Sequence, residues 1–314
     1  MAASAVKAAR VTDALVDLGK TRCRLRLVSE GRVLTEGSGV GAPGLAAPEG
    51  VSAAEHAVLT LLDSVVPALA PPPLETIVVG AAGAIASPAA ADGLARELLE
   101  RTPARSAVVT SDAITSHVGA LGAEPGVALV VGTGAVAVAL DEQGRLAVDD
   151  GGGPVTGDLG SGAWIGAEAL RRAEAGAHPL AALARARFGD DWHDLAADAG
   201  SYELARRRGT FVPDVARLAR AGDPESRAVI SAAADHLATI VRAARDPLFD
   251  RSAAVPVALL GGLSALGALL TDRLACGIAP SRLVTARGSA LDGAATLLER
   301  PDLPHEAHVV RRGV

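Results

Sequence analysis

Two glycine-rich turns near the middle of the sequence have the residue types of a phosphate-binding backbone. The first is Gly132-Thr133-Gly134, between apolar runs at 127–131 and 135–140, and the second is the stretch 157–166, which begins Gly157-Asp158. Glycine tolerates a positive φ and lets main-chain N–H groups approach an anion closely. Many glycines only make hairpin turns, but a pair of turns that both contain hydroxyl side chains favours phosphate binding.

A third glycine turn, near the N-terminus, carries an acid and a hydroxyl. A short strand at 14–17 leads into the turn, and the alternating pattern of 23–28 predicts a second strand. The Gly-Lys-Thr triplet here is not a P-loop, because position 14 is alanine where that motif needs glycine and because a strand follows instead of a helix. In this β-hairpin, Asp17 either bonds its own turn or holds a hydrated Mg²⁺, while the Thr21 hydroxyl and turn amides meet phosphate.

An aspartate lies where a predicted strand gives way to a predicted helix. Apolar residues 107–110 precede Ser111-Asp112, and a helix is expected over 113–121. Two roles fit Asp112. It is either the N-cap of the helix or a general base at the carboxyl end of a sheet, where open α/β folds place their ligands.

A strand, two glycines and a helix follow one another toward the C-terminus. The strand is expected over 255–260 and the helix over 265–275, with Gly261, Gly262 and Ser264 between them. This turn offers a close backbone surface on which a purine can lie, although many strand–helix turns use glycine for packing alone.

The elements that position these residues alternate between strands and helices, which predicts an α/β fold. A chain of 314 residues is long enough for two lobes, and with 49% hydrophobic but 2% aromatic residues its core is built from Ala, Val and Leu. A formal net charge of −6 without a basic run argues against nucleic acid as the main partner.

The compartment is predicted from what the sequence lacks. Cys23 and Cys276 form neither a disulfide framework nor a metal-binding pattern, which fits a reducing cytoplasm. The N-terminus has no signal-peptide pattern, and the uncharged stretch 252–271 is interrupted by Pro256, so we expect no membrane span. His305 and His308 lie in a segment, 301–314, that is predicted to be an exposed tail.

In their order along the chain, these features resemble the phosphate-1, catalytic-aspartate, phosphate-2 and adenosine motifs of the actin-like ATPase and sugar-kinase superfamily. The closer resemblance is to the BadF/BadG/BcrA/BcrD ATPase family, which includes N-acetylglucosamine kinases. It covers nearly the whole chain. The segments that carry it are DLGKT (17–21), TSDA (110–113), GTG (132–134), GDLGSGAWIG (157–166) and Gly261-Gly262, of which 157–166 is the most specific.

The resemblance implies an α/β fold of two ribonuclease-H-like (actin-like ATPase) lobes with a cleft between them. The N-terminal lobe is expected over 1–118, rejoined by a C-terminal helix at 289–300. The second lobe, with a helical insertion, is expected over 119–288. The implied reaction is ATP- and Mg²⁺-dependent phosphorylation of a sugar, with N-acetylglucosamine and its 6-phosphate as the leading pair, and the implied assembly is a homodimer.

The resemblance also implies a role for each site residue. Asp112 takes the proton of the sugar hydroxyl, Asp17 organises Mg²⁺, and Gly157 and Asp158 contact the sugar. Phosphoryl transfer of this kind depends on positioning and charge neutralisation more than on covalent help. The residues implied to bind ATP are Gly19, Lys20, Thr21, Gly132, Thr133, Gly134, Gly261, Gly262 and Ser264.

Three residues depart from the family pattern. Lys20 replaces a glycine or small polar residue in the first phosphate turn, and Leu159 stands where many relatives have Glu. Leu45 lies about where N-acetylglucosamine kinases offer an Asn to the sugar, and a missing hydrogen-bonding side chain weakens the choice of that sugar, because such groups discriminate strongly.

Other functions remain open or are disfavoured. Another amino sugar, such as glucosamine or N-acetylmuramate, is an alternative substrate, and a non-catalytic sugar- or ATP-sensing regulator is an alternative role. An iron–sulfur activator is disfavoured by the two unclustered cysteines. Dinucleotide binding, with Asp149 and Asp150 as ribose acids, is disfavoured because 135–140 is a strand and that fingerprint must open a helix.

Overall fold

The computed structural model describes residues 11–65, 73–153, 155, 157–176, 178–196 and 201–313. The chain divides into two compact units. Unit 1 contains the described residues up to Ala123 and from Gly288 onward, and unit 2 runs from Glu124 to Arg287. Each unit is built on its own mixed sheet, so the prediction of two α/β lobes is confirmed. Residues 119–123 belong to unit 1 and not to the second lobe, because the helix α3 (Asp112–Leu121) runs unbroken through the expected boundary.

Unit 1 has a six-stranded sheet with the order β11-β5-β4-β1-β2-β3. The first three strands form an antiparallel meander, and β1, β4 and β5 are parallel to one another. Its elements are β1 (Thr12–Leu18), β2 (Arg22–Ser29), β3 (Arg32–Val40), α1 (Gly50–Val65), β4 (Leu74–Ala81), α2 (Pro88–Arg101), β5 (Ser106–Thr110), α3, α11 (Ala290–Glu299), the 3-10 helix η3 (Pro304–His308) and β11 (Val310–Gly313).

The central strands of unit 1 are apolar on both faces because helices cover both. Val16 and Val79 belong to a core that also contains residues of α1 and α2, whereas the alternate residues Leu15 and Val78 pack in a cluster with Leu291 of α11. Buried parallel strands of this kind appear in a sequence as continuous hydrophobic runs.

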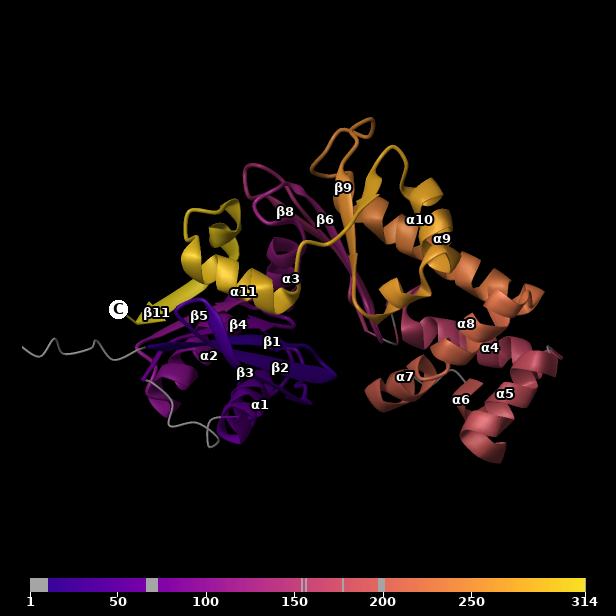
Figure 1. Cartoon of the computed structure of the whole chain (residues 1–314), viewed down its shortest axis with the longest axis horizontal. Helices are drawn as coiled ribbons and strands as arrows, with labels where there is room; N and C mark the ends of the chain where they lie inside the picture. Colours follow the sequence, from indigo (N-terminus) through magenta and orange to yellow (C-terminus); the bar gives the residue numbers. More distant parts are fainter. Residues whose placement is uncertain are drawn as a thin grey trace, which may run out of the picture. The chain divides into compact units, whose positions relative to one another are not determined.

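Helices α3 and α11 meet through glycines, although they are far apart in the sequence (Figure 1). A Cβ on Gly119 would overlap the carbonyl oxygen of Ser289, and a Cβ on Gly293 would overlap that of Thr115. Glycine at both positions therefore lets the two backbones touch, and α11 supports the helix that begins with Asp112.

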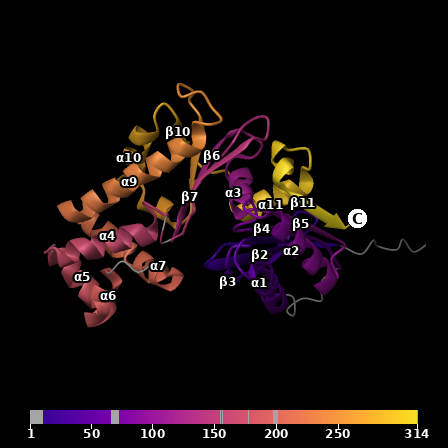
Figure 2. The same ribbon diagram turned by 180° about the vertical axis from the view of Figure 1, so that it is seen from behind.

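The prediction of an exposed tail at 301–314 is wrong for the residues that the structure describes. β11 pairs antiparallel with β5, as Figures 1 and 2 both show, and His305 is fully buried. Its Nε2 lies 3.0 Å from Nδ1 of His117 on α3, and the Thr110 hydroxyl donates to the carbonyl of His308 at 2.8 Å. The segment packs because β5 would otherwise be an uncovered edge strand. Its four-residue strand is too short to give a clear periodic signal.

Unit 2 has a five-stranded sheet with the order β10-β9-β6-β7-β8, in which β6, β7 and β8 form an antiparallel meander and β9 and β10 run parallel to β6. Its strands are β6 (Gly126–Val131), β7 (Ala135–Leu140), β8 (Leu146–Asp150), β9 (Pro256–Leu260) and β10 (Arg282–Val284). Its helices are α4 (Gly162–Glu174), α5 (His178–Phe188), η1 (Gly189–Asp191), α6 (Trp192–Ala196), α7 (Tyr202–Gly209), α8 (Val212–Ala221), α9 (Pro224–Arg245), η2 (Gly262–Leu266) and α10 (Ala268–Ile278).

One hydrophobic core joins the sheet of unit 2 to its helices. Alternate residues of β6, among them Leu129, pack with Ile165 of α4 and Leu237 of α9. The helices α4 to α7 lie together in Figure 2. In the sequence they follow the meander and precede α8 and α9, which lead to β9.

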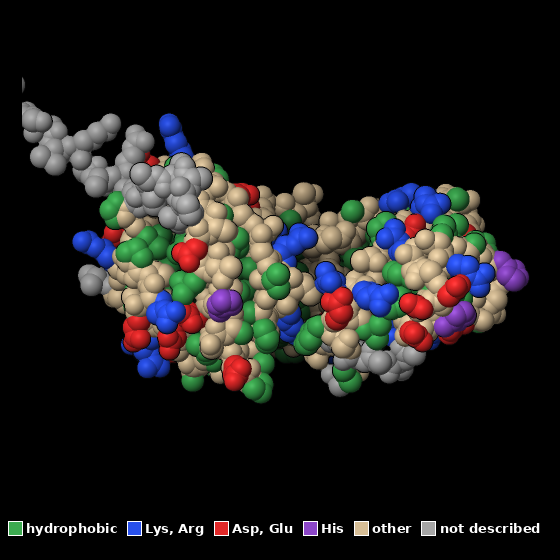
Figure 3. Space-filling view, turned by 90° about the horizontal axis from the view of Figure 1, so that it is seen from below, with side chains coloured by type: hydrophobic (Ala, Val, Ile, Leu, Met, Phe, Trp, Pro, Cys, Tyr) green, Lys and Arg blue, Asp and Glu red, His purple; other side chains and the backbone are tan. Residues whose placement is uncertain are grey.

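The surface is charged without a dominant sign on the face that Figure 3 draws, where acidic and basic side chains are interspersed. In the described part of the chain, no helix combines the length and the apolar character needed to cross a membrane.

Candidate functional site

In unit 1, the register of the strands places Asp17 at the same level of the sheet as the end of β5, which leads to Asp112. Asp17 of β1 is aligned with Gly80 of β4, and Gly80 is aligned with Thr110 of β5. Neighbouring strands are about 4.8 Å apart, so Asp17 and Thr110 lie at the same level of the sheet, about 10 Å apart. A Cβ on Gly80 would overlap the Thr115 hydroxyl, so glycine lets α3 sit directly over this level.

Asp112 is the first residue of α3 and is not its N-cap. Ser111 caps the helix by accepting from the Ala113 N–H at 3.2 Å, and its own hydroxyl donates to Asp112 Oδ1 at 3.0 Å. The Ala113 N–H also donates to that oxygen at 2.9 Å. These bonds hold the carboxylate at the end of β5.

The surroundings of Asp112 raise its pKa to about 6. Burial is the main cause, and the negative charge of Asp17 adds to it, while the bonds from Ser111 and Ala113 and the charge of Lys20 oppose it. A carboxyl group with a pKa near neutrality is suited to accept a proton from an alcohol. This coupling of Asp112 to Asp17 could not be predicted from the sequence, because it depends on the distance between β1 and the β5–α3 junction.

Asp17 is buried and forms an ion pair that sequence analysis did not predict. Arg24, its cross-strand partner on β2, binds Asp17 Oδ2 through Nη2 at 2.5 Å and through Nε at 3.0 Å. Burial raises the pKa of Asp17, and the guanidinium of Arg24 opposes that rise. The alternation of 23–28 indicated a strand but not which of its residues faces Asp17, because that depends on the register of the hairpin.

The turn at Gly19 is tightly built beneath its exposed side chains. The Gly19 N–H donates to the Arg22 carbonyl at 2.9 Å, and the Gly19 carbonyl accepts from Ala42 at 3.3 Å. Gly41 packs against this turn so closely that a Cβ would overlap the Gly19 carbonyl oxygen. Lys20 and Thr21 are exposed on the outside of the turn.

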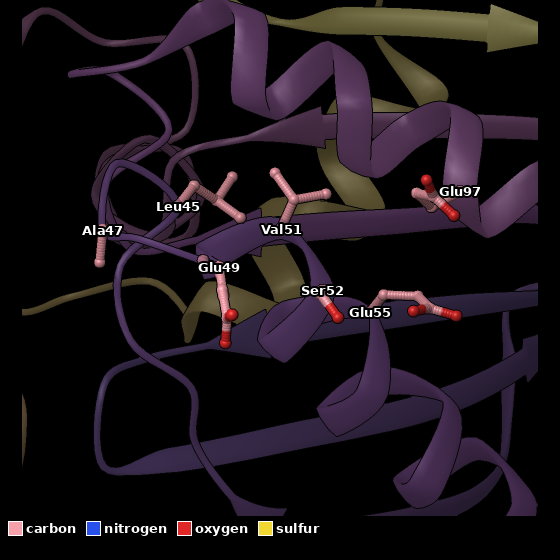
Figure 4. A pocket seen from close by; sticks show the side chains of 8 residues that line it. Leu45, Ala47, Glu49, Val51, Ser52, Glu55 and Glu97 are labelled. Atoms are coloured by element: carbon pink, nitrogen blue, oxygen red, sulfur yellow. The ribbon is translucent and has the colours of Figure 1, made fainter.

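Leu45 lies in the core of unit 1, with 3% of its surface exposed. Its N–H donates to the Ala82 carbonyl at 2.8 Å. It lines a pocket of about 410 Å³, shown in Figure 4, in which Leu45, Ala47 and Glu49 lie at one end and Glu55 and Glu97 at the other. Glu55 pairs with Arg101 at 3.4 Å. The Leu45 side chain therefore contributes apolar packing here.

In unit 2, the two glycine turns predicted to bind phosphate form one structure. The Gly162 N–H donates to the Gly132 carbonyl at 2.9 Å, and the Ala163 N–H donates to the Thr133 carbonyl at 3.1 Å. Asp158 completes the connection, because its Oδ1 accepts from the Ala135 N–H at 2.9 Å. A Cβ on Gly134 would lie 2.6 Å from that oxygen, so glycine makes room for the carboxylate.

Asp150 shapes the second turn, a role that sequence analysis missed. Its Oδ1 accepts from the Asp158 N–H at 2.6 Å and its Oδ2 from the Leu159 N–H at 3.1 Å. Asp150 and Asp158 both have positive φ, at 65° and 59°, which is uncommon for residues other than glycine. Position 157 requires glycine, because a Cβ there would overlap Asp150 Oδ1. The signal in the sequence was the position of Asp150, an acidic residue directly before a run of three glycines.

Gly261 and Gly262 differ in what surrounds them. Gly261 has φ 91°, and a Cβ there would overlap the carbonyl oxygen of Val131, the residue before the first glycine turn. Gly262 has no atom within 4 Å of a Cβ position and is exposed. The Ser264 hydroxyl donates to the Gly261 carbonyl at 2.8 Å. A short 3-10 helix, η2, begins at Gly262, before α10.

The predicted site residues thus fall into two groups. Unit 1 brings together Asp17, the turn at Gly19 and Asp112, while unit 2 brings together the glycine turns, Asp158 and Gly261. Among the residues that the structure describes, no cluster of three or more His, Cys, Asp or Glu side chains is placed to hold a metal. Two carboxylates close enough to raise one pKa still fit Mg²⁺, which typically takes one or two carboxylates together with phosphate and water oxygens.

The sequence pattern of the BadF/BadG/BcrA/BcrD ATPase family matches residues 16–274 of this chain. That range includes both carboxylates of unit 1, both glycine turns of unit 2 and the Gly261-Gly262 pair. A comparison with curated proteins gives no match.

Solved structures of similar fold include sugar kinases. A provisionally assigned N-acetylglucosamine kinase from Chromobacterium violaceum is 28% identical with a TM-score of 0.70, and the match covers 91% of this chain and 98% of that one. A provisionally assigned N-acetylglucosamine kinase from Porphyromonas gingivalis is 18% identical with a TM-score of 0.68, covering 92% and 98%. A ROK-family glucokinase from Streptomyces griseus, solved with glucose and AMPPNP, is 18% identical with a TM-score of 0.58, covering 91% and 98%. The last two likenesses show a shared fold alone.

Proposed function

The chain belongs to the BadF/BadG/BcrA/BcrD ATPase family, and from this premise we propose that it is an ATP-dependent kinase that phosphorylates a sugar hydroxyl. The observation that carries the proposal is the Asp112 carboxylate, which Ser111 and Ala113 hold at the end of β5, with a pKa near 6, beside Asp17. Such a group is matched to the removal of a proton from an alcohol at neutral pH.

In the proposed reaction, the oxygen of the sugar hydroxyl attacks the γ-phosphorus of ATP while Asp112 accepts the proton of that hydroxyl. A bond forms between that oxygen and phosphorus, and the bond between the γ-phosphorus and the oxygen that bridges it to the β-phosphate breaks. The products are ADP and a sugar phosphate, and Asp112 later releases the proton to water. Catalysis of this transfer rests on positioning and on neutralising phosphate charge.

The glycine turns are proposed to supply much of the positioning. The turns Gly19–Thr21 in unit 1 and Gly132–Gly134 in unit 2 would meet phosphate oxygens through main-chain N–H groups other than those of Gly19 and Gly132, which donate within their turns. The hydroxyls of Thr21 and Thr133 would add to these contacts. Lys20 would add a positive charge. Gly262 is exposed with open space above it, which suits contact with the adenine, while Ser264 holds the carbonyl of Gly261.

Asp17 is proposed to hold a hydrated Mg²⁺, because it is an acidic side chain at the turn where phosphate is expected. When bound, the ion would neutralise charge on the β- and γ-phosphates. Arg24 binds Asp17 Oδ2, so we propose that its guanidinium balances the negative charge of Asp17 before the nucleotide binds.

Asp158 and Gly157 are proposed to face the sugar, with N-acetylglucosamine as the first candidate and its 6-hydroxyl as the acceptor. The 28% identical structure from Chromobacterium violaceum supports this choice. Leu45 does not support it, because its buried side chain offers no hydrogen bond. Glucosamine and N-acetylmuramate therefore stay in the candidate set, and a homodimer stays a prediction.

The test is to identify the product. The purified chain is incubated with ATP, Mg²⁺ and each sugar, and the products are analysed by mass spectrometry and by phosphorus NMR. Conversion of one sugar to a monophosphate supports the proposal, and NMR couplings show which oxygen carries the phosphate. Release of inorganic phosphate at an equal rate with and without every sugar would show an ATPase in place of a sugar kinase.

A further inference from the structure

The ion pair between Asp17 and Arg24 uses one oxygen of the carboxylate and leaves the other open. Arg24 Nη2 and Nε both donate to Asp17 Oδ2, at 2.5 Å and 3.0 Å. Within the described part of the chain, no other hydrogen bond reaches the Asp17 carboxylate. The guanidinium therefore holds one oxygen of the residue that is proposed to hold Mg²⁺, and Oδ1 can accept a further partner.

The two members of this ion pair differ in how easily they can move. The Asp17 side chain is 12% exposed, and its strand β1 is paired on both sides, with β2 and with β4. The Arg24 side chain is 46% exposed and sits on a long, flexible stem. An ion pair with a half-exposed member is held weakly, because water and salt screen it. Arg24 is therefore the member that can leave, while the Asp17 carboxylate stays in place.

Arg24 supplies the positive charge that stabilises ionised Asp17. Burial raises the pKa of Asp17, and the guanidinium opposes that rise. The charge of Asp17 also contributes to the raised pKa of Asp112, so the two carboxylates repel each other. A cation beside Asp17 relieves both effects. Because Mg²⁺ would bring positive charge to the same carboxylate, the guanidinium and the ion compete for it.

Arg24 also lies beside the turn that is proposed to meet phosphate. Asp17 and Arg24 are cross-strand neighbours, and the next pair, Leu18 and Cys23, is the last one before the turn at Gly19. A guanidinium binds phosphate oxygens with the same paired N–H groups that bind a carboxylate. A nucleotide phosphate at this turn therefore offers Arg24 a second anionic partner.

We infer that Arg24 is a positioning residue, which holds Asp17 while the site is empty and moves to a phosphate oxygen when the nucleotide arrives. Asp17 is then released for Mg²⁺ in the presence of the nucleotide, so the chain binds the metal together with ATP and only weakly alone. The inference rests on the proposed role of Asp17. It goes beyond that role by naming the residue that couples the two ligands.

The test measures binding of Mn²⁺, a paramagnetic substitute for Mg²⁺, to the full chain by electron paramagnetic resonance, without nucleotide and with saturating AMPPNP. In Arg24→Met the competing guanidinium is gone, so we expect Mn²⁺ alone to bind about tenfold more tightly than to the natural protein. The factor by which AMPPNP tightens Mn²⁺ binding should fall by about the same amount, because the nucleotide no longer has to release Asp17. A merely structural ion pair would not change this factor.

Three further variants assign the effect to this ion pair, and melting of each checks that it is folded. Arg24→Lys keeps a positive charge and should bind Mn²⁺ alone nearly as weakly as the natural protein. Asp17→Asn, added to Arg24→Met, should abolish the gain. Arg22→Met is the matched control. Arg22 lies two residues from Arg24 on β2, so it points to the same face of the sheet, and it is exposed and forms no ion pair with the described residues.

The outcomes separate this inference from the kinase proposal, because neither measurement uses a sugar. Tighter Mn²⁺ binding and a smaller nucleotide effect in Arg24→Met, with no sugar phosphate formed by the natural protein, would support the role of Arg24 and overturn the kinase. Sugar phosphorylation by the natural protein, with both quantities unchanged in folded Arg24→Met, would support the kinase and overturn the role of Arg24. An equal gain in Arg22→Met would also overturn that role, because the gain would then come from net charge.

Discussion

Asp158 Oδ1 accepts a hydrogen bond from the Ala135 N–H at 2.9 Å, and this bond joins two glycine loops that a β-hairpin separates in the sequence. The carboxylate lies where a side chain on Gly134 would be, because a Cβ there would be 2.9 Å from Asp158 Cγ. The backbone proposed to bind phosphate and the side chain proposed to face the sugar are thus parts of one arrangement, and a change in either is expected to affect the other.

Gly134→Ala is therefore expected to destabilise the protein, whereas Gly132→Ala is not. The methyl group at 134 would collide with Asp158, at a cost of about 1–3 kcal/mol, while position 132 has no atom within 4 Å of a Cβ. Chemical denaturation measures both. Adding Asp158→Ala to Gly134→Ala should recover most of the loss, and no recovery would mean that the collision is with something other than this carboxylate.

Gly261 and Gly262 are expected to respond differently to substitution, because the backbone requires glycine at 261 while 262 is proposed to contact the adenine. Gly261→Ala combines a positive φ with overlap of the Val131 carbonyl and should cost at least about 2 kcal/mol of unfolding free energy. Gly262→Ala should leave stability unchanged and weaken ATP binding, as measured by calorimetry. Unchanged ATP affinity in Gly262→Ala would contradict the placement of adenine at this turn.

The activity is expected to rise with pH as Asp112 loses its proton. Because its pKa is raised to about 6, kcat/KM should increase about tenfold per pH unit below that value and level off above it. The activity at about pH 5 should then be about one-tenth of that at neutral pH. Initial rates across the range measure this, and a flat profile down to about pH 4 would mean that another group is the base.

Stability should respond to pH through His305. Burial, followed by the neighbouring charges of His117 and His308, lowers the pKa of His305 to about 3. The stability that comes from burying neutral His305 is fully present above pH 6.5, the pKa of the side chain in the unfolded chain. As the pH falls below 6.5, the unfolded chain takes up a proton that the folded protein does not, and the free energy of unfolding falls by up to about 1.4 kcal/mol per pH unit. The free energy of unfolding of His305→Leu should fall less steeply than that of the natural protein between about pH 6.5 and pH 4. Equal slopes would contradict a buried neutral His305.

Much of the fold was predictable because its signals are local. Continuous apolar runs such as 127–131 mark strands buried on both faces, and glycine turns mark the hairpins. The C-terminal segment was mispredicted because its four-residue strand and the burial of His305 depend on β5 and α3. A partner so distant in the sequence leaves no periodic pattern in the segment itself.

The candidate site was predictable in its residue types and not in its contacts. Asp17, Asp112 and Asp158 could be chosen because each lies at a turn or junction. The ion pair of Asp17 with Arg24, the hold of Asp150 on the Asp158 loop and the coupling of Asp112 to Asp17 depend on register and on positive φ values. Those are set by the folded backbone.

Asp112 is proposed to be the base of a sugar kinase. The most direct measurement compares ADP release by the natural protein and by Asp112→Asn, with ATP, Mg²⁺ and N-acetylglucosamine, glucosamine, N-acetylmuramate or glucose. Asn keeps the size of the side chain and removes the base. We predict turnover on at least one sugar that falls by about 10²–10⁴-fold in the folded variant, with ATP binding retained. Full turnover by Asp112→Asn would contradict the role of Asp112 as base, and no turnover on any sugar by the natural protein would contradict the sugar-kinase proposal.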